Sequence, residues 1–205
     1  MIDPETDVVT VDGRRVAAPH AHRYVMLNKP LGVITTARDE ASRTTVLDVV
    51  GEEGRAGHRL FPVGRLDANS TGLLILSDDG DLSFRLTHPR YKVSKEYLVA
   101  VGGIPTAKDL DQLRTGVRLD DGITAPAEVE VMSAEGNRAV LRVTIREGRH
   151  RQVRRMLQAV GHKTLALRRT SFGPLRLGRL KVGGWRVLSS GEVEALRRAT
   201  GLSAK

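Results

Sequence analysis

Cysteine is absent from the 205-residue sequence. Its absence excludes a disulfide framework, a thiolate metal or iron–sulfur site, and a cysteine nucleophile. Long apolar runs are also missing: residues 72–76 (GLLIL) fall far short of the roughly 18 residues that a membrane span needs. The acidic N-terminus lacks the apolar core of a signal peptide. We therefore expect a soluble cytoplasmic protein without a membrane partner, whose covalent chemistry uses oxygen or nitrogen side chains.

Patterns for metal or nucleotide binding are missing as well. The six histidines show no metal-ligand spacing beyond His20-x-His22. The acids at 78, 79 and 81 are interpreted as a turn followed by a helix cap at Asp81 rather than as metal ligands. Neither a GxxxxGK motif followed by Ser or Thr nor a GxGxxG motif occurs. The sequence therefore predicts no metal site and indicates no bound nucleotide.

Acidic residues are nearly absent from residues 138–186. This segment carries 12 arginines and two lysines against one acid, Glu147, which gives +13, whereas the whole chain has a net charge of +9. Charge concentrated in this way favours a polyanionic partner, and nucleic acid is the usual one. The alternative is a solvated basic face that has no partner.

Strand and helix patterns alternate along the chain without a fixed repeat. Residues 7–16 are typical of a hairpin, followed by a linker to residue 22 and one domain over residues 23–205. Hairpins mixed with helices predict an α+β fold, with a mixed, mainly antiparallel central sheet and flanking helices. The predicted strands are residues 24–27, 33–36, 73–77, 96–101, 127–132, 139–145 and 163–168, and the predicted helices are residues 106–114, 151–160 and 192–199.

Asp67 lies in a sequence context that is typical of a catalytic carboxylate. It precedes a polar, glycine-bounded loop at residues 69–72, and a strand of the fully buried type follows. Catalytic groups often lie in such loops at the edge of a rigid sheet. The alternative, which the spacing alone favours, is that Asp67 caps a turn or pairs with Arg65.

Arginines dominate residues 146–156 (REGRHRQVRRM), at a predicted strand–turn–helix transition. Arginine forks bind carboxylates or phosphate oxygens, and the single nearby acid leaves most of these arginines for outside partners. His150 is a candidate general base, although a loop contact with RNA or solvent is the simpler interpretation. Tyr97 is a candidate for stacking on a base or a half-buried packing residue. Lys29, beside a proline–glycine turn, is a candidate phosphate contact.

Together these stretches resemble a known family. NKPLG at residues 28–32, GRLD at 64–67, KEY at 95–97 and EGRHRQVRRM at 147–156 have the order and spacing of ribosomal RNA pseudouridine synthases of the RsuA/RluB type. Residues 159–188 resemble the large-subunit branch. The resemblance covers about residues 23–198. Members usually begin with a small RNA-binding module, and residues 1–22 resemble only a remnant of that module and its linker.

The resemblance implies an enzyme that isomerises uridine to pseudouridine in ribosomal RNA or a ribosomal assembly particle, as a monomer without metal or cofactor. The target uridine leaves its stack, its glycosidic bond breaks, and the uracil rejoins the ribose through carbon 5. Asp67 is the implied catalytic carboxylate, either as a nucleophile at the anomeric carbon or as a base at the 2′ carbon. Arg154 is implied to pair with Asp67, and Tyr97 to stack on the base and help the final proton removal. The implied RNA-binding residues are Lys29, Arg65, Arg149, Arg151 and Arg155.

Two alternatives stay open at this point. One is a non-catalytic RNA-binding or ribosome-assembly factor on the same scaffold, and the other is a synthase that acts on small-subunit ribosomal RNA or transfer RNA. A binding module has no need of Asp67, Tyr97 and Arg154 together, so their joint presence favours the enzyme. The sequence from residue 159 onward favours large-subunit RNA.

Overall fold

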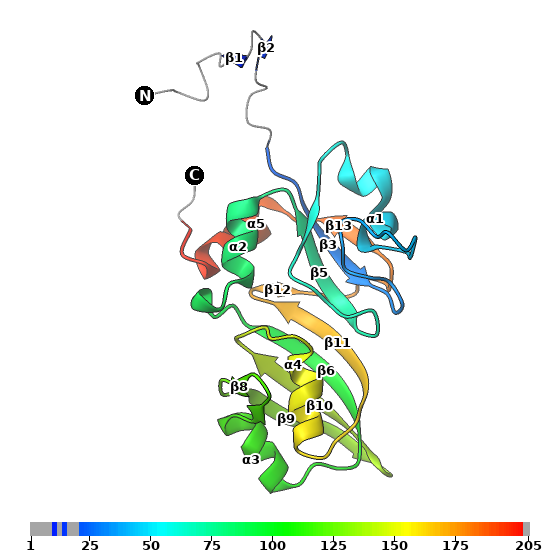
Figure 1. Ribbon diagram of the computed structural model, residues 1–205, viewed down its shortest axis with the longest axis vertical. Helices are drawn as coiled ribbons and strands as arrows, with labels where there is room; N and C mark the ends of the chain where they lie inside the picture. Colours follow the sequence, from blue (N-terminus) through cyan, green and yellow to red (C-terminus); the bar gives the residue numbers. More distant parts are fainter. Residues whose placement is uncertain (1–9, 12–13, 16–20, 203–205) are drawn as a thin grey trace.

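The computed structural model describes residues 10–11, 14–15 and 21–202, and Figure 1 shows their arrangement. The main strands are β3 (Tyr24–Lys29), β4 (Phe61–Val63), β5 (Thr71–Ser77), β6 (Lys95–Gly102), β9 (Glu128–Glu135), β10 (Arg138–Ile145), β11 (Thr164–Phe172), β12 (Leu175–Arg176) and β13 (Trp185–Val187). They form one sheet in the order β13-β3-β5-β11-β6-β10-β9, with β4 paired to β5 and β12 to β11. The β5–β11 pairing is parallel and the others are antiparallel. The predicted α+β fold with a mainly antiparallel sheet is confirmed.

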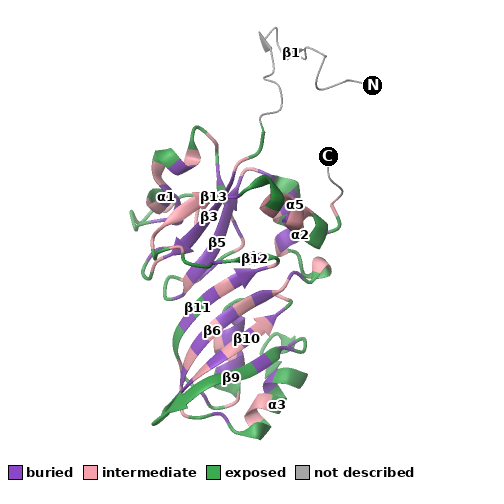
Figure 2. Cartoon of the chain, turned by 180° about the vertical axis from the view of Figure 1, so that it is seen from behind, coloured by how far each residue is buried: buried purple, intermediate pink, exposed green. Residues whose placement is uncertain are grey.

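Strand β5 is buried on both of its faces. Leu74 and Leu76 enter one hydrophobic core, whereas Leu73 and Ile75 enter a second core on the other side of the sheet. A continuous apolar run is typical of a strand that is covered on both faces. Figure 2 shows β5 and its neighbour β3 as a buried band through the upper half of the molecule. The loop that precedes β5 therefore starts from a rigid support.

Helices cover both faces of the sheet. They are α1 (Val46–Arg55), α2 (Gly80–Thr87), α3 (Ala107–Thr115), α4 (Gln152–Ala159) and α5 (Ser190–Ala199), with a short 3-10 helix, η1 (Pro89–Tyr91), after α2. Helices α1, α3 and α4 pack into the core that contains Leu74, and α2 and α5 pack into the core that contains Leu73. Within the described residues, no helix is both long and apolar enough to cross a membrane.

Several local expectations differ from the structure. Residues 33–36 form no strand: they contribute a single bridge from Ile34 to Thr45, because no neighbouring strand continues the pairing. Helix α1 was not predicted, since Gly51 with a φ of 64° interrupts its periodicity. Helix α2 begins after Asp79, whose side chain accepts a hydrogen bond from the amide of Leu82, so Asp79 rather than Asp81 caps it.

The predicted N-terminal hairpin is described only in part. Strand β1 (Thr10–Val11) pairs antiparallel with β2 (Arg14–Arg15), as the sequence predicts. The other residues of the predicted 7–16 hairpin, and the linker as far as residue 20, lie outside the described residues. The division into residues 1–22 and 23–205 therefore stays a prediction.

Candidate active site

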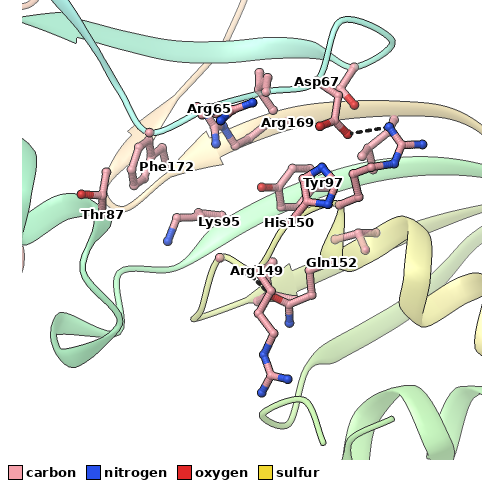
Figure 3. Close-up of a pocket in the computed structure, with 18 residues that line it drawn as sticks. Arg65, Asp67, Thr87, Lys95, Tyr97, Arg149, His150, Gln152, Arg169 and Phe172 are labelled. Carbon is pink, nitrogen blue, oxygen red and sulfur yellow. Dashed lines mark hydrogen bonds and ion pairs between the residues drawn. The ribbon is translucent and has the colours of Figure 1, made fainter. Parts of the chain in front are cut away.

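A cavity of about 370 Å³ opens between the loop that follows β4 and the turn that follows β10 (Figure 3). Strands β6 and β11 supply much of its remaining lining. Five of the eight predicted site residues line this cavity: Arg65, Asp67, Tyr97, Arg149 and Arg151. Segments that are far apart in the sequence, such as residues 64–67 and 148–153, therefore meet at one place, as the predicted site requires.

Asp67 lies in a loop that several hydrogen bonds hold. The chain turns at Gly64, where φ is 73°, a value that favours glycine. The hydroxyl of Thr35 donates to the carbonyl of Leu66 at 2.7 Å, and the amide of Ser70 donates to the carbonyl of Asp67 at 3.0 Å. These contacts fix the backbone on both sides of the carboxylate, whose side chain is 26% exposed.

Two arginines approach the carboxylate of Asp67. Arg151 donates from Nη1 to Oδ2 at 3.2 Å, and Arg154 places Nε 3.9 Å from the same oxygen. The shorter contacts of Arg154 are to the loop itself: its Nη2 donates to the carbonyl of Asn69 at 2.7 Å and to Ser70 Oγ at 3.3 Å. Burial lowers the pKa of Arg154, the charge of Arg151 adds to this effect, and Asp67 opposes it.

This geometry changes the predicted division of roles between the two arginines. Arg151 was predicted to bind phosphate, yet it makes the hydrogen bond to Asp67. Arg154 was predicted to pair with Asp67, and it lies farther away while it supports the loop. The reason is the backbone of Arg151, which adopts a left-handed conformation with a φ of 49° just before α4 and directs its side chain to Asp67. Both arginines act on the same carboxylate.

Tyr97 lies on the inward face of β6, between Lys95 and Val99 in the alternating burial pattern. It is 7% exposed and is paired in register with Val143 on β10 and Arg169 on β11. In Figure 3 its ring lies between Asp67 and Lys95. A flat ring in this place can stack on a planar group that enters beside Asp67.

Lys29 is not placed where an RNA phosphate can reach it. The side chain is completely buried, and Nζ donates to the carbonyls of Pro30 at 3.0 Å and Ser70 at 2.9 Å. Burial lowers the pKa of Lys29 to about 8, and the charge of Asp67 partly opposes this shift. The structure contradicts the prediction that Lys29 binds phosphate, because its cation is used to hold the loop that carries Asp67.

Arg149 and Arg155 are also occupied within the protein. Arg149 donates to the carbonyls of Asp121, Gly122 and Ile123, and to the carboxylate of Glu147. These carbonyls belong to the hairpin of β7 (Arg118–Leu119) and β8 (Gly122–Ile123). Arg155 donates to the carboxylate of Asp121 at 2.8 Å. The structure therefore argues against a phosphate contact for Arg149, and it gives Arg155 an internal partner.

The cavity lining also includes Lys95, Arg169 and Phe172, to which the sequence assigns no role. All three are buried, and the two cations lie 5.3 Å and 5.0 Å from the centre of the Phe172 ring. For Lys95 and Arg169, the signal in the sequence is a cation at an inward position of an apolar strand. Such a position is unusual, because buried charges are normally paired.

The fold and the cavity agree with the comparisons. A family model described as RNA pseudouridylate synthase matches residues 23–159. The chain belongs to this family: it is an RNA pseudouridine synthase, an enzyme that isomerises uridine in RNA.

Several relatives match nearly the whole chain, among them proteins of Aquifex aeolicus and Bacillus subtilis. An uncharacterized RNA pseudouridine synthase of Aquifex aeolicus (strain VF5) is 42% identical over 202 residues, which cover 98% of this chain and 80% of the relative. The ribosomal large subunit pseudouridine synthase B of Bacillus subtilis (strain 168) is 39% identical over 194 residues, which cover 94% and 78%.

Solved structures show the same fold. A crystal structure of a pseudouridylate synthase matches with a TM-score of 0.78 at 32% identity, over 96% of this chain and 82% of that chain. The archaeal box H/ACA Nop10–Cbf5 complex matches with a TM-score of 0.55 at 18% identity, over 75% and 48%. At that identity the second match shows the shared fold alone.

Proposed function

We propose that this enzyme modifies a uridine of large-subunit ribosomal RNA and that Asp67 is its catalytic carboxylate. The observation that carries the role of Asp67 is its position in the cavity, 3.2 Å from Arg151 Nη1 and 3.9 Å from Arg154 Nε. The name of the B. subtilis relative supports the choice of RNA. The enzyme would act in the cytoplasm as a monomer, on the RNA or on an assembly particle, without a metal or cofactor.

The proposed reaction requires an ionised Asp67. In one route its carboxylate attacks the anomeric carbon, and in the other it removes the proton from the 2′ carbon. Both routes break the bond between C1′ and N1 and leave the bonding electron pair on uracil. The ring then turns and C5 bonds to C1′. In the first route this displaces the Asp67 carboxylate from C1′, and in the second C5 adds to the C1′=C2′ double bond while Asp67 returns the proton to C2′. C5 then loses its proton.

Arg151 and Arg154 would keep Asp67 ionised when the uracil displaces water from the cavity. Loss of water disfavours a charged carboxylate, and a cation at close range opposes this effect. Arg154 is well suited to the role because its side chain is only 11% exposed, so bulk solvent screens it little. Tyr97 would stack on the flipped uracil and help to remove the C5 proton.

Exposed arginines at the cavity would contact the RNA backbone. Arg65 lines the cavity and is exposed. The strongly basic segment 138–186 supports a polyanionic substrate, since phosphate contacts supply most of the affinity for RNA in such proteins. Arg155 stays a proposed contact only through the part of its guanidinium that Asp121 does not occupy.

The experiment that tests the proposal maps pseudouridine by carbodiimide modification in ribosomal RNA from cells that lack the protein. One pseudouridine in large-subunit RNA should be lost, and the wild-type gene should restore it, whereas Asp67→Asn should not. Restoration by Asp67→Asn would refute the catalytic role of Asp67. Loss of a pseudouridine from small-subunit RNA only would refute the choice of RNA, and no change at any uridine would indicate a non-catalytic function.

A further inference from the structure

The cavity contains two buried cations that pair with no acid in residues 21–202, the main part that the structure describes. Lys95 is 8% exposed and Arg169 is 2% exposed, and both line the cavity. Among the described residues, Lys95 donates only to the carbonyl of Val93, at 3.1 Å, and Arg169 donates from Nε to the carbonyl of Leu73 at 2.7 Å. In the part of the chain that the structure describes, Arg169 Nη2 is buried and has no hydrogen-bond partner.

This arrangement is costly for the folded protein. A buried charge is normally paired, and a buried donor is normally hydrogen-bonded. Burial lowers the pKa of Lys95 to about 8, and the nearby charge of Arg169 adds to the effect. The ring of Phe172, which both cations approach, compensates only part of the lost hydration. Two such groups in one cavity fit a ligand that brings negative charge.

We infer that Lys95 and Arg169 bind the carbonyl oxygens of the uracil and stabilise the negative charge that the ring acquires as it leaves the ribose. This inference rests on the proposed function, in which Asp67 lies at the ribose. When the C1′–N1 bond breaks, its electron pair moves onto the ring and is shared by N1, O2 and O4. Asp67 either forms the new bond to C1′ or takes the 2′ proton. The uracil ring acquires the same negative charge in both routes.

The position of the two cations favours the base over a phosphate. Lys95 and Tyr97 are two residues apart on the same face of β6, and Arg169 is opposite Tyr97 on β11. A uracil that stacks on Tyr97 with its ribose at Asp67 therefore has Lys95 and Arg169 on its far side (Figure 3). A phosphate would stay near solvent, where Arg65 is available.

The two cations favour the reaction because the negative charge on the ring forms only as the C1′–N1 bond breaks. Bound uracil is neutral, whereas the departing ring is an anion, so two fixed cations stabilise the transition state more than the bound substrate. Donors that are already in place require no reorganisation as the charge develops. This accounts for a pair of cations that have no acidic partner among the described residues of the free enzyme.

The test compares uridine with 5-fluorouridine in the same large-subunit RNA transcript. Fluorine withdraws electrons and makes the departing ring a more stable anion, so the reaction depends less on outside stabilisation. Single-turnover loss of the N-glycoside is followed by chromatography of nuclease digests, with wild type, Lys95→Met and the exposed control Lys108→Met. RNA binding is measured in parallel by filter retention.

We expect Lys95→Met to slow the reaction of uridine by about 100-fold, the typical loss when one such donor is removed. The loss on 5-fluorouridine should be less than about 10-fold because that leaving group needs less help. Lys95→Met should bind the RNA with the same dissociation constant as wild type. Lys108→Met should match wild type in both RNA binding and reaction rates. An equal loss on both transcripts, or a weaker affinity that accounts for the whole loss, would overturn the inference. If wild type converts neither transcript, the proposed function itself has failed.

Discussion

Lys95→Met should make the protein more stable at pH 7, although it removes a group that we place in the active site. The pKa of Lys95 falls from 10.5 to about 8 because the side chain is buried beside Arg169. At about 1.4 kcal/mol for each tenfold change, the buried charge costs about 3 kcal/mol at neutral pH. Methionine loses the hydrogen bond to Val93 and the contact of the ammonium with Phe172, together about 1–2 kcal/mol. The free energy of unfolding should therefore rise by about 1–2 kcal/mol.

The sign of the pH dependence follows from the same pKa. Below pH 8 the lysine is charged in both states, so wild type bears the full cost of the buried charge. Between about pH 8 and 10.5 the folded protein has lost this proton while the unfolded chain still holds it, and wild type gains stability as pH rises. At about 1.4 kcal/mol per pH unit, the advantage of Lys95→Met should shrink across this window and reverse near its middle, at about pH 9.

Urea unfolding at pH 7, 8, 9 and 10 checks this prediction, with Lys108→Met as the exposed control. Differences between variant and wild type cancel the titration of the other groups. A variant that is less stable than wild type at pH 7, or a difference that does not change with pH, would show that Lys95 is not an uncompensated buried charge.

Further predictions concern the support of the cavity. Gly72→Ala should lower the free energy of unfolding in urea by about 2–4 kcal/mol, because the φ of Gly72 is 106° and an added Cβ would collide with the backbone of β11. In the control Gly80→Ala the added Cβ contacts no other atom, so the free energy of unfolding should not change. Arg149→Ala should lower the free energy of unfolding by about 2 kcal/mol, because the carbonyls of the β7–β8 hairpin lose a charged donor. Arg151→Ala should lower the single-turnover rate at saturating RNA by at least about 10-fold if it supports Asp67, and an effect on RNA affinity alone would contradict that role.

The sheet and the loop that carries Asp67 could be predicted because they depend on local patterns. The continuous apolar run of β5 and the alternation in β6 each indicate a strand, and these two observed strands contain the predicted ranges 73–77 and 96–101. Helix α1 could have been found from its capping box, Thr45 with Asp48, although Gly51 interrupts the pattern that follows.

The roles of individual cations could not be predicted in the same way. The sequence predicts Lys29 and Arg149 to be available to RNA because a count of acids does not reveal their partners, which are mostly backbone carbonyls. Arg151 and Arg154 are three residues apart and both face the Asp67 loop, so spacing does not separate their roles. The left-handed backbone at Arg151 decides which of them makes the hydrogen bond, and that conformation is unusual for a residue other than glycine.

The central claim is that Asp67 in this cavity converts uridine to pseudouridine, and the loss of the C5 proton measures that conversion directly. Large-subunit RNA labelled with tritium at C5 of uracil is incubated with the purified protein, and tritium released into water is counted. Wild type should release one equivalent for each target uridine. Asp67→Asn should release none, although it binds the RNA with the same affinity. Release by Asp67→Asn at the wild-type rate would contradict the account.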